Sequence, residues 1–92
     1  MEIKYDPRKC ERNIQERGLS FERVNDFEFE TAWFVEDRRR DYGETRIRAF
    51  GYLDSRLHAL VFTVTGEVLR VISLRRANRR EVKRYEAATN QS

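Results

Sequence analysis

The chain has 92 residues, too few to bury two separate cores without disulfides or bound metals, so it should form one domain. Charged residues make up 38% of it, well above the roughly 25% of an average soluble protein. One cysteine and one histidine exclude a disulfide framework, a thiolate or imidazole zinc cluster, and catalysis by two histidines. The chain has neither the ~18 apolar residues of a membrane span nor a signal-peptide core. We therefore expect a soluble, cytoplasmic protein.

The net charge of +3 is distributed unevenly along the chain. Residues 1–44 hold 9 Lys and Arg against 12 Asp and Glu, whereas residues 45–92 hold 10 against 4. Most of the basic excess lies between Arg70 and Arg84, and arginine predominates over lysine throughout. Because the planar guanidinium matches the geometry of phosphate, this segment is either an anion site or a solvated basic helix face.

The first half also contains four acidic residues close together: Glu22, Asp26, Glu28 and Glu30. This acidic cluster could repel RNA from the face on which it lies, bind a basic partner, or do neither. The sequence alone leaves these three interpretations open.

The N-terminal segment predicts a short strand at residues 3–5 and a helix at residues 7–17. Asp6 can accept hydrogen bonds from the free amides of the first turn, which Pro7 also fits. Gly18 is the expected left-handed residue that ends the helix. Within this helix, Cys10 and Ile14 lie one turn apart and should form a narrow apolar stripe, so Cys10 is interpreted as a core contact and not as a reactive thiol.

Ser20 can cap a second, shorter helix that runs to residue 27. Three apolar residues at three-residue spacing should pack this helix into the core: Phe21, Val24 and Phe27. From residue 31 the hydrophobic period changes to two, which indicates strands. The expected strands cover residues 31–35, 45–53, 57–65 and 68–74. The last three should form an antiparallel meander, because short turns connect them.

The final helix should open at Asn78, since Asn78 and Glu81 have the spacing of a capping box. It should run to about residue 88, with Val82 and Tyr85 facing the sheet, and residues 89–92 should form a frayed tail. Residues 1–88 are then a single α+β domain with the order β-α-α-β-β-β-β-α. We expect a mainly antiparallel sheet with the helices covering one face.

A set of residues distributed over nearly the whole chain matches a known family. The matched residues are Tyr5-Asp6-Pro7, Asn13, Arg17-Gly18, Phe21, Glu44-x-Arg46, Gly51, Arg70-x-Ile72-Ser73-x-Arg75-x-Ala77, Arg80-Glu81 and Tyr85. With them the chain resembles the BrnT toxins of bacterial BrnT–BrnA type II toxin–antitoxin pairs. The block that begins at Arg70 is the most specific part. The chain departs from the family at Tyr5, usually Trp, and at Arg17, usually His, and we assign no role to Arg17.

This resemblance implies a RelE-like fold and a ribonuclease that cleaves RNA without a metal or another cofactor and thereby arrests growth. It also implies neutralisation by a BrnA-type antitoxin with a ribbon-helix-helix DNA-binding part. Because such domains are dimeric, a 2:2 heterotetramer is the expected complex. Operator DNA should then be bound only through the antitoxin, and no membrane is involved.

Metal-independent RNA cleavage requires removal of the 2′-hydroxyl proton, stabilisation of charge on the phosphorane, and protonation of the 5′ leaving oxygen. In RelE-like toxins, arginine, lysine, glutamate and tyrosine perform these tasks. The candidate catalytic residues are Glu44, Arg46, Arg70, Arg75, Tyr85 and His58. The candidate RNA-binding residues are Trp33, Arg76, Arg79, Arg80, Lys83 and Arg84.

Arg70 lies in the middle of an otherwise apolar strand, where a charged side chain needs a reason. It either binds phosphate or occupies a solvent-facing or edge position. Arg75 and Arg76 are expected to leave the strand at its end, where they and Arg79 could form a phosphate clamp.

Glu44 and Arg46 are two residues apart, so on a strand they project from the same face. If that face binds RNA, Glu44 is the candidate general base and Arg46 a clamp on the transition state. The alternative is a surface ion pair worth roughly a few tenths of a kcal/mol. For Glu81, its position in the capping box favours a structural role over that of a base.

Three further candidates have both a functional and a structural interpretation. His58 could transfer a proton near neutral pH, although a single histidine on a strand is more often structural. Tyr85 could offer its hydroxyl to RNA or pack against the sheet. Trp33 could stack on an exposed base, whereas the small core favours packing.

The leading hypothesis is therefore a toxin endoribonuclease that binds RNA along its basic C-terminal segment. One alternative is a non-catalytic nucleic-acid-binding module, in which the same arginines only neutralise phosphates. Another is an interaction module that acts only with its partner.

Overall fold

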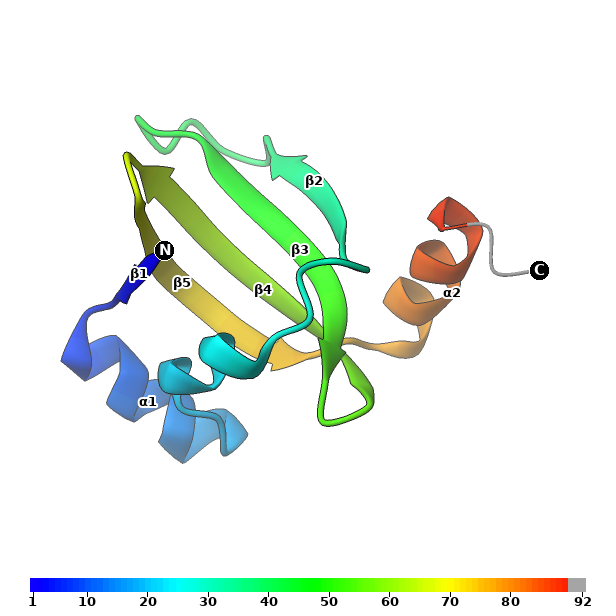
Figure 1. Cartoon of the computed structure of the whole chain (residues 1–92), viewed down its shortest axis with the longest axis horizontal. Helices are drawn as coiled ribbons and strands as arrows, with labels where there is room; N and C mark the ends of the chain where they lie inside the picture. The colour runs from blue at the N-terminus through cyan, green and yellow to red at the C-terminus, as the bar shows by residue number, and fades with distance from the viewer. Residues whose placement is uncertain (90–92) are drawn as a thin grey trace.

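The computed structural model describes residues 1–89, and Figure 1 shows them as one α+β unit. Its elements are β1 (Glu2–Lys4), α1 (Pro7–Arg17), the 3₁₀ helix η1 (Phe21–Asp26), β2 (Trp33–Asp37), β3 (Arg46–Leu53), β4 (Arg56–Thr65), β5 (Val68–Arg76) and α2 (Arg79–Ala88). The five strands form one sheet in the order β1-β5-β4-β3-β2. Strand β1 pairs with β5 in parallel, and every other pair is antiparallel.

The N-terminal helices begin and end at the residues that favour those positions. The Asp6 carboxylate accepts a hydrogen bond from the Arg8 amide at 2.9 Å, and Gly18 ends α1 with a φ of 69°. Ser20 caps the next helix by accepting from the Glu22 amide at 3.2 Å. This second helix is 3₁₀ and not α.

Helix α2 begins with the predicted capping box. The Asn78 side chain accepts from the Glu81 amide at 2.8 Å, and the Glu81 carboxylate accepts from the Asn78 amide at 2.9 Å. At the other end of α2, Thr89 donates from its backbone amide to the Tyr85 carbonyl at 2.9 Å. The other residues of the expected frayed tail, 90–92, lie outside the described residues.

Strands β2 and β5 differ most from the expected ranges, whereas β1, β3 and β4 are each shifted by one residue at one end or both. Strand β2 begins two residues later than predicted, because Ala32 closes a turn by donating to the Phe29 carbonyl at 3.2 Å. Strand β5 continues to Arg76, and Arg75 pairs with Ala59 on β4. The prediction that Arg75 and Arg76 leave the strand is therefore wrong. Their side chains alternate between the two faces of the sheet instead of forming one clamp.

Two hydrophobic clusters pack on opposite faces of the sheet. The larger one joins α1 and η1 to Ala49, Leu60 and neighbouring side chains, whereas the smaller one joins Tyr85 of α2 to Phe50 and Ala59. Successive strand residues face opposite sides, so α2 covers the face that α1 and η1 leave open. The expectation that all helices cover one face is wrong. Figure 1 shows α2 at the end of the sheet away from α1.

The buried stripe of α1 also differs from the expected one. Cys10 is buried as predicted, whereas Ile14 is 40% exposed. Asn13 is buried instead, and its amide donates to the carbonyls of Leu19 at 2.8 Å and Leu74 at 2.9 Å. The bond to Leu74 is buried and attaches α1 to β5 through a polar contact.

Candidate functional site

Arginines from β3 and β5, the two strands that flank β4, project from the same face of the sheet. Arg46 and Arg48 on β3 share a face with Phe50, and Arg75 on β5 lies opposite Ala59 of that face. The face continues through Arg70 on β5 and, beside it in register, Lys4 on β1. We call Lys4, Arg46, Arg48, Arg70 and Arg75 the basic face. Helix α2 packs over only the end of this face near Phe50, so a polar surface remains open beyond it.

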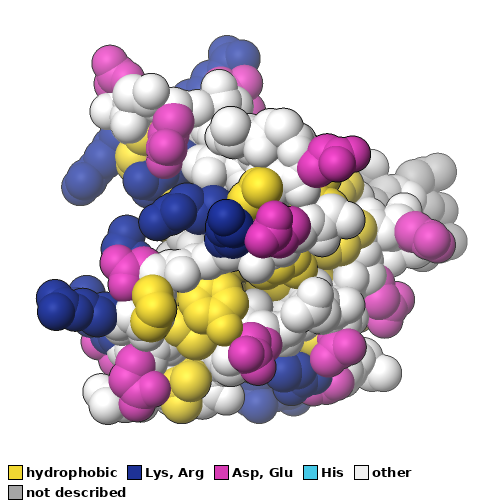
Figure 2. Space-filling model, turned by 60° about the vertical axis from the view of Figure 1, so that its left-hand side comes forward, with side chains coloured by type: hydrophobic (Ala, Val, Ile, Leu, Met, Phe, Trp, Pro, Cys, Tyr) yellow, Lys and Arg dark blue, Asp and Glu magenta, His cyan; other side chains and the backbone are white. Residues whose placement is uncertain are grey.

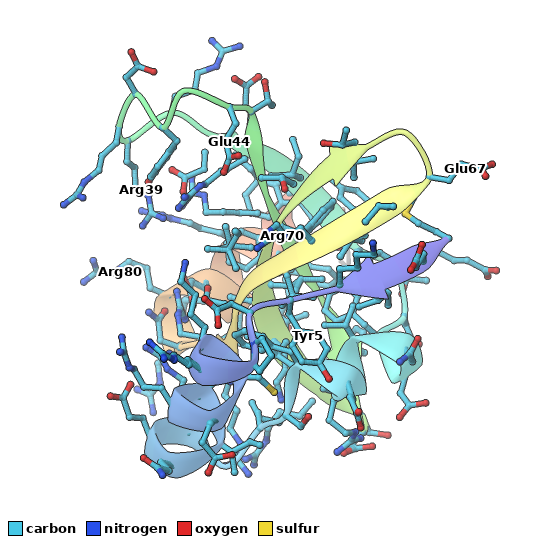
Figure 3. All side chains as sticks on the ribbon, turned by 90° about the vertical axis from the view of Figure 1, so that its left-hand side faces the viewer. Tyr5, Arg39, Glu44, Glu67, Arg70 and Arg80 are labelled. Carbon is cyan, nitrogen blue, oxygen red and sulfur yellow. The ribbon has the colours of Figure 1, made fainter. Side chains whose placement is uncertain are left out.

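Arg70 is the most available cation of the basic face. Its side chain is exposed, and within residues 1–89 it makes no hydrogen bond or ion pair. In Figure 3, Arg70 extends from β5 on the side of the sheet where Arg39 and Glu44 also lie. An unpaired, exposed guanidinium on a rigid strand can bind a phosphate without first breaking an internal contact.

The loop between β2 and β3 holds a further arginine in a fixed position. The Asp37 carboxylate accepts from Nε of Arg39 at 2.8 Å and from its Nη2 at 2.7 Å, and Tyr42 donates its hydroxyl at 3.2 Å. The Asp37 side chain is 1% exposed. The hydrogen bonds from Arg39 hold the pKa of the Asp37 carboxyl well below its usual range, although burial opposes this effect. The same pairing raises the pKa of Arg39.

Arg46 is positioned by the same loop. Its guanidinium carbon lies 4.0 Å from the centre of the Tyr42 ring, and its Nε lies 3.3 Å from the Glu44 carboxylate. Tyr42 thus links Arg46 to the Asp37–Arg39 pair. Glu44 and Arg46 form an ion pair, which the sequence left open as the alternative to a catalytic role, and Glu44 precedes β3 and remains exposed.

Arg75 and Glu81 connect the basic face to α2. The two side chains form two parallel hydrogen bonds of 2.8 Å each, with 13% of the Glu81 side chain exposed. Hydrogen bonds from Arg75 are the main reason that the pKa of Glu81 is lowered, with Arg48 adding to the effect. Glu81 is therefore an ionised capping residue that holds Arg75, which makes it a poor general base.

Arg48 is a residue of this face that the search for candidates in the sequence missed. Its Nε is buried and has no hydrogen-bond partner among the described residues. A buried donor without a partner costs roughly 1–3 kcal/mol, and such groups are found at sites that bind ligands. Arg39 was missed as well. Arg48 could have been predicted, since it lies two residues after Arg46 on one strand and so shares its face. Only the fold places Arg39 beside this face.

The Asp37 pair predicts a pH-dependent contribution to stability. Because the folded pKa is depressed, the stabilisation is present above the ordinary Asp value of about 3.9 and is lost as pH falls through the folded value. We expect Asp37→Asn to lower the free energy of unfolding by roughly 1–3 kcal/mol at pH 7 and by less at pH 3, measured by urea denaturation. The control Asp41→Asn, an exposed residue of the same loop, should change stability by less than about 0.5 kcal/mol. Equal losses for Asp37→Asn at both pH values would contradict this expectation.

Tyr85 and Trp33 lie in the smaller hydrophobic cluster. Tyr85 is 3% exposed, and its hydroxyl donates to the Thr31 carbonyl at 2.7 Å. The half-buried Trp33 ring packs against Phe50 with the ring centres 5.5 Å apart. Both side chains therefore pack against the sheet. The Tyr85 hydroxyl also joins α2 to the segment before β2.

His58 and Arg76 lie on the opposite face from Arg46, Arg70 and Arg75. They pair in register, His58 near the start of β4 and Arg76 at the end of β5, and line a polar pocket of about 530 Å³ together with Arg17 and Arg56. His58 is 4% exposed, and its Nδ1 lies 2.7 Å from the Arg56 carbonyl oxygen. The residues that the sequence grouped into one site are thus divided between two faces.

The remaining candidate RNA-binding cations are on α2, where all four are exposed: Arg79, Arg80, Lys83 and Arg84. Figure 3 shows Arg80 extending away from the sheet. Over residues 1–89, the structure contains no group of three His, Cys, Asp or Glu side chains that could hold a metal ion. No helix in that part of the chain is both long and apolar enough to span a membrane.

Comparison with known proteins identifies the family. The family described as "Ribonuclease toxin, BrnT, of type II toxin-antitoxin system" matches residues 5–81, which include every strand from β2 to β5 and the start of α2. None of the curated proteins that were compared with the chain matches it. Because the family match covers most of the 92 residues, the chain belongs to the BrnT family of ribonuclease toxins of type II toxin–antitoxin systems.

Proposed function

We propose that this toxin is a metal-independent endoribonuclease of the cytoplasm that cleaves RNA on its basic face and thereby arrests growth. The observation that carries the proposal is the convergence of Arg46, Arg48, Arg70 and Arg75 on one face of the sheet, with Arg70 exposed and the Arg48 Nε unsatisfied. A phosphate placed there can accept hydrogen bonds from guanidinium groups that are held by strands.

In the proposed reaction, Glu44 takes the proton of the 2′-hydroxyl, and the resulting oxygen attacks the adjacent phosphorus. Glu44 is exposed and lies just before β3, and its contact with Arg46 at 3.3 Å places a base beside a cation. Arg46 and Arg70 stabilise the negative charge that develops on the phosphorane. The face is open, so a water molecule can give a proton to the 5′ oxygen as it leaves, and the hydroxide that remains takes the proton held by Glu44.

The positions of Arg39 and Arg75 support this arrangement. Each guanidinium forms two hydrogen bonds with a carboxylate of low exposure, Asp37 or Glu81, so its orientation is fixed before substrate binds. Such preorganised cations stabilise developing charge without reorganising during the reaction. These two arginines are proposed to orient the RNA backbone on either side of Arg46.

A type II system implies an antitoxin partner for this chain. We propose that this partner is a BrnA-type antitoxin whose ribbon-helix-helix part binds operator DNA, in a complex with two copies of each chain. The toxin itself then contributes little to DNA binding.

Removal of divalent metals should leave the activity unchanged. We expect the antitoxin-free protein to cut a defined single-stranded RNA at rates that differ by less than about twofold with and without EDTA, because arginines supply the charge that a metal would otherwise supply. The products should carry a 2′,3′-cyclic phosphate, as attack by the 2′-hydroxyl requires, and mass spectrometry can identify it. Activity that EDTA abolishes, and that added Mg²⁺ restores, would contradict metal independence.

A non-catalytic module that binds nucleic acid is the alternative supported by the same basic face. It predicts RNA binding that weakens steeply with salt but no cleavage at any enzyme concentration. The cleavage assay therefore separates the two functions.

A further inference from the structure

A groove lined by apolar side chains lies on the sheet face opposite the basic face. It has a volume of about 490 Å³, and its apolar lining residues include Met1, Ile3, Phe29, Phe34, Phe62 and Val64. Figure 2 shows hydrophobic side chains gathered on one side of the molecule, with both acidic and basic side chains around them. Helices α1 and η1 pack over another part of this face, and Val24 of η1 also lines the groove.

Several large side chains of the groove are unusually exposed. Among the described residues, four large hydrophobic side chains are exposed, and three of them line the groove: Met1 at 76%, Phe34 at 48% and Val64 at 46%. The fourth, Ile14, lies on α1 at 40% exposure. Singly exposed apolar residues are normal on protein surfaces, whereas a contiguous exposed group marks an interaction site.

The acidic cluster borders this groove. Asn25 of η1 and Phe29 of the following loop line it, and the four acidic residues noted in the sequence belong to the same segments: Glu22, Asp26, Glu28 and Glu30. Asp26 pairs with Arg23 at 3.4 Å, and Glu22 accepts from the Tyr5 hydroxyl at 3.3 Å. Within residues 1–89, the side chains of Glu28 and Glu30 make no ion pair. Two uncompensated carboxylates therefore lie beside an apolar surface.

This combination favours one kind of occupant. RNA is repelled by the carboxylates and finds its cations on the opposite face. A protein segment with apolar anchors and flanking Lys or Arg residues matches both the groove and its border. We propose that this groove binds such a segment of the antitoxin, which the family assignment supplies as the partner. A specific complex buries more than ~1,000 Å², so the segment must continue from the groove over the acidic border.

The apolar part of the proposal is tested by binding of the purified antitoxin of the same toxin–antitoxin pair to the full-length toxin. Phe34→Asp places a charge in the groove and should weaken the affinity at least ~30-fold, as loss of a central interface contact does. Ile14→Asp is the matched control, because it changes a similarly exposed apolar residue outside the groove, and the affinity of this variant should stay within about threefold of wild type. Isothermal titration calorimetry measures both.

The electrostatic part of the proposal is tested separately by reversing the charge of the acidic residues beside the groove. Glu28→Lys with Glu30→Lys should weaken binding about tenfold at low salt and reduce the dependence of affinity on salt. The double control Glu11→Lys with Glu86→Lys makes the same change in net charge on α1 and α2, away from the groove. It should retain the salt dependence of wild type.

Melting temperature and RNA cleavage show whether a loss of antitoxin binding comes from the groove and not from unfolding. Without antitoxin, Phe34→Asp and Ile14→Asp should have similar melting temperatures. Phe34→Asp should also cleave RNA as fast as wild type, because the groove and the basic face lie on opposite sides of the sheet. If wild type cuts no RNA, the proposed function fails while the binding experiment still decides the docking site.

Two results would overturn the docking proposal. In the first, Phe34→Asp binds the antitoxin as tightly as Ile14→Asp. In the second, sedimentation shows that the free toxin is a dimer which Phe34→Asp converts to a monomer, so that the occupant is a second copy of the chain.

Discussion

Arg70→Ala should lower kcat/KM for RNA cleavage by ~100-fold or more, the loss typical of removing one group that stabilises transition-state charge. Arg70 is exposed and makes no internal ion pair or hydrogen bond within residues 1–89, so its replacement removes a contact with substrate and little else. The melting temperature should therefore change by no more than a few degrees. Rates on a defined RNA, measured with enzyme in excess, separate the chemical step from product release.

Arg76→Ala is the matched control for Arg70→Ala. Both arginines are exposed residues of β5, but Arg76 pairs with His58 and belongs to the opposite face. The variant should cleave RNA within about threefold of wild type. The reverse result, with Arg76→Ala inactive and Arg70→Ala active, would place the reaction in the polar pocket that His58 lines. Full activity in both variants would exclude both sites.

Arg75→Ala is less informative than Arg70→Ala, although both residues belong to the basic face. Its removal leaves the Glu81 carboxylate, 13% exposed, without its two strongest hydrogen bonds. The start of α2 would lose stability together with any loss of activity. A fall in cleavage by this variant must therefore be compared with its free energy of unfolding.

The parts of the fold that could be predicted from sequence are those encoded by neighbouring residues. Helix α1 is bounded by Asp6 and Gly18, and α2 opens at the Asn78 capping box, because each of these signals acts within one turn of helix. The meander of β3, β4 and β5 followed from alternating strands joined by tight turns, such as Asp54-Ser55, where both residues have positive φ.

Long-range contacts decide the parts that were mispredicted. The face on which α2 packs depends on how Tyr85 and Val82 meet Phe50, and no local pattern reports this choice. The length of β5 has the same origin. Arg75 and Arg76 continue the strand because β4 extends far enough to pair with them. Local charge favoured a loop at these positions, and pairing with a neighbouring strand outweighed it.

The candidate site shows the same division. The spacing of Glu44 and Arg46 allowed an ion pair between them, and strand alternation explains why Arg70 and Arg75 join them on one face. Arg39 could not be predicted, because Asp37 and Tyr42 fix it only in the folded loop. His58 was selected for its chemistry alone, and a residue's chemistry does not indicate the face on which it lies.

Gly51→Ala should destabilise the protein by about 2–3 kcal/mol and lower its melting temperature by roughly 10 °C or more. A Cβ at this position would lie 2.7 Å and 2.9 Å from two ring carbons of Phe27 and 3.0 Å from the Cβ of Ala32. Phe27 is 5% exposed and packs against Phe29, with ring centres 4.9 Å apart, so its ring has little room to move. The methyl group therefore strains the packing of the segment between η1 and β2.

A double-mutant cycle tests this cause. Phe27→Ala destabilises the protein on its own but removes the ring that the new methyl group would meet, so Gly51→Ala should cost at least 1 kcal/mol less in that background, by an order-of-magnitude argument. Additive losses would show that the ring is not the obstacle. Because Phe29 lines the apolar groove, displacement of this segment in Gly51→Ala should also weaken antitoxin binding. The same variant should keep its RNA cleavage at a temperature where it is folded, since Arg46 and Arg70 face the other side of the sheet.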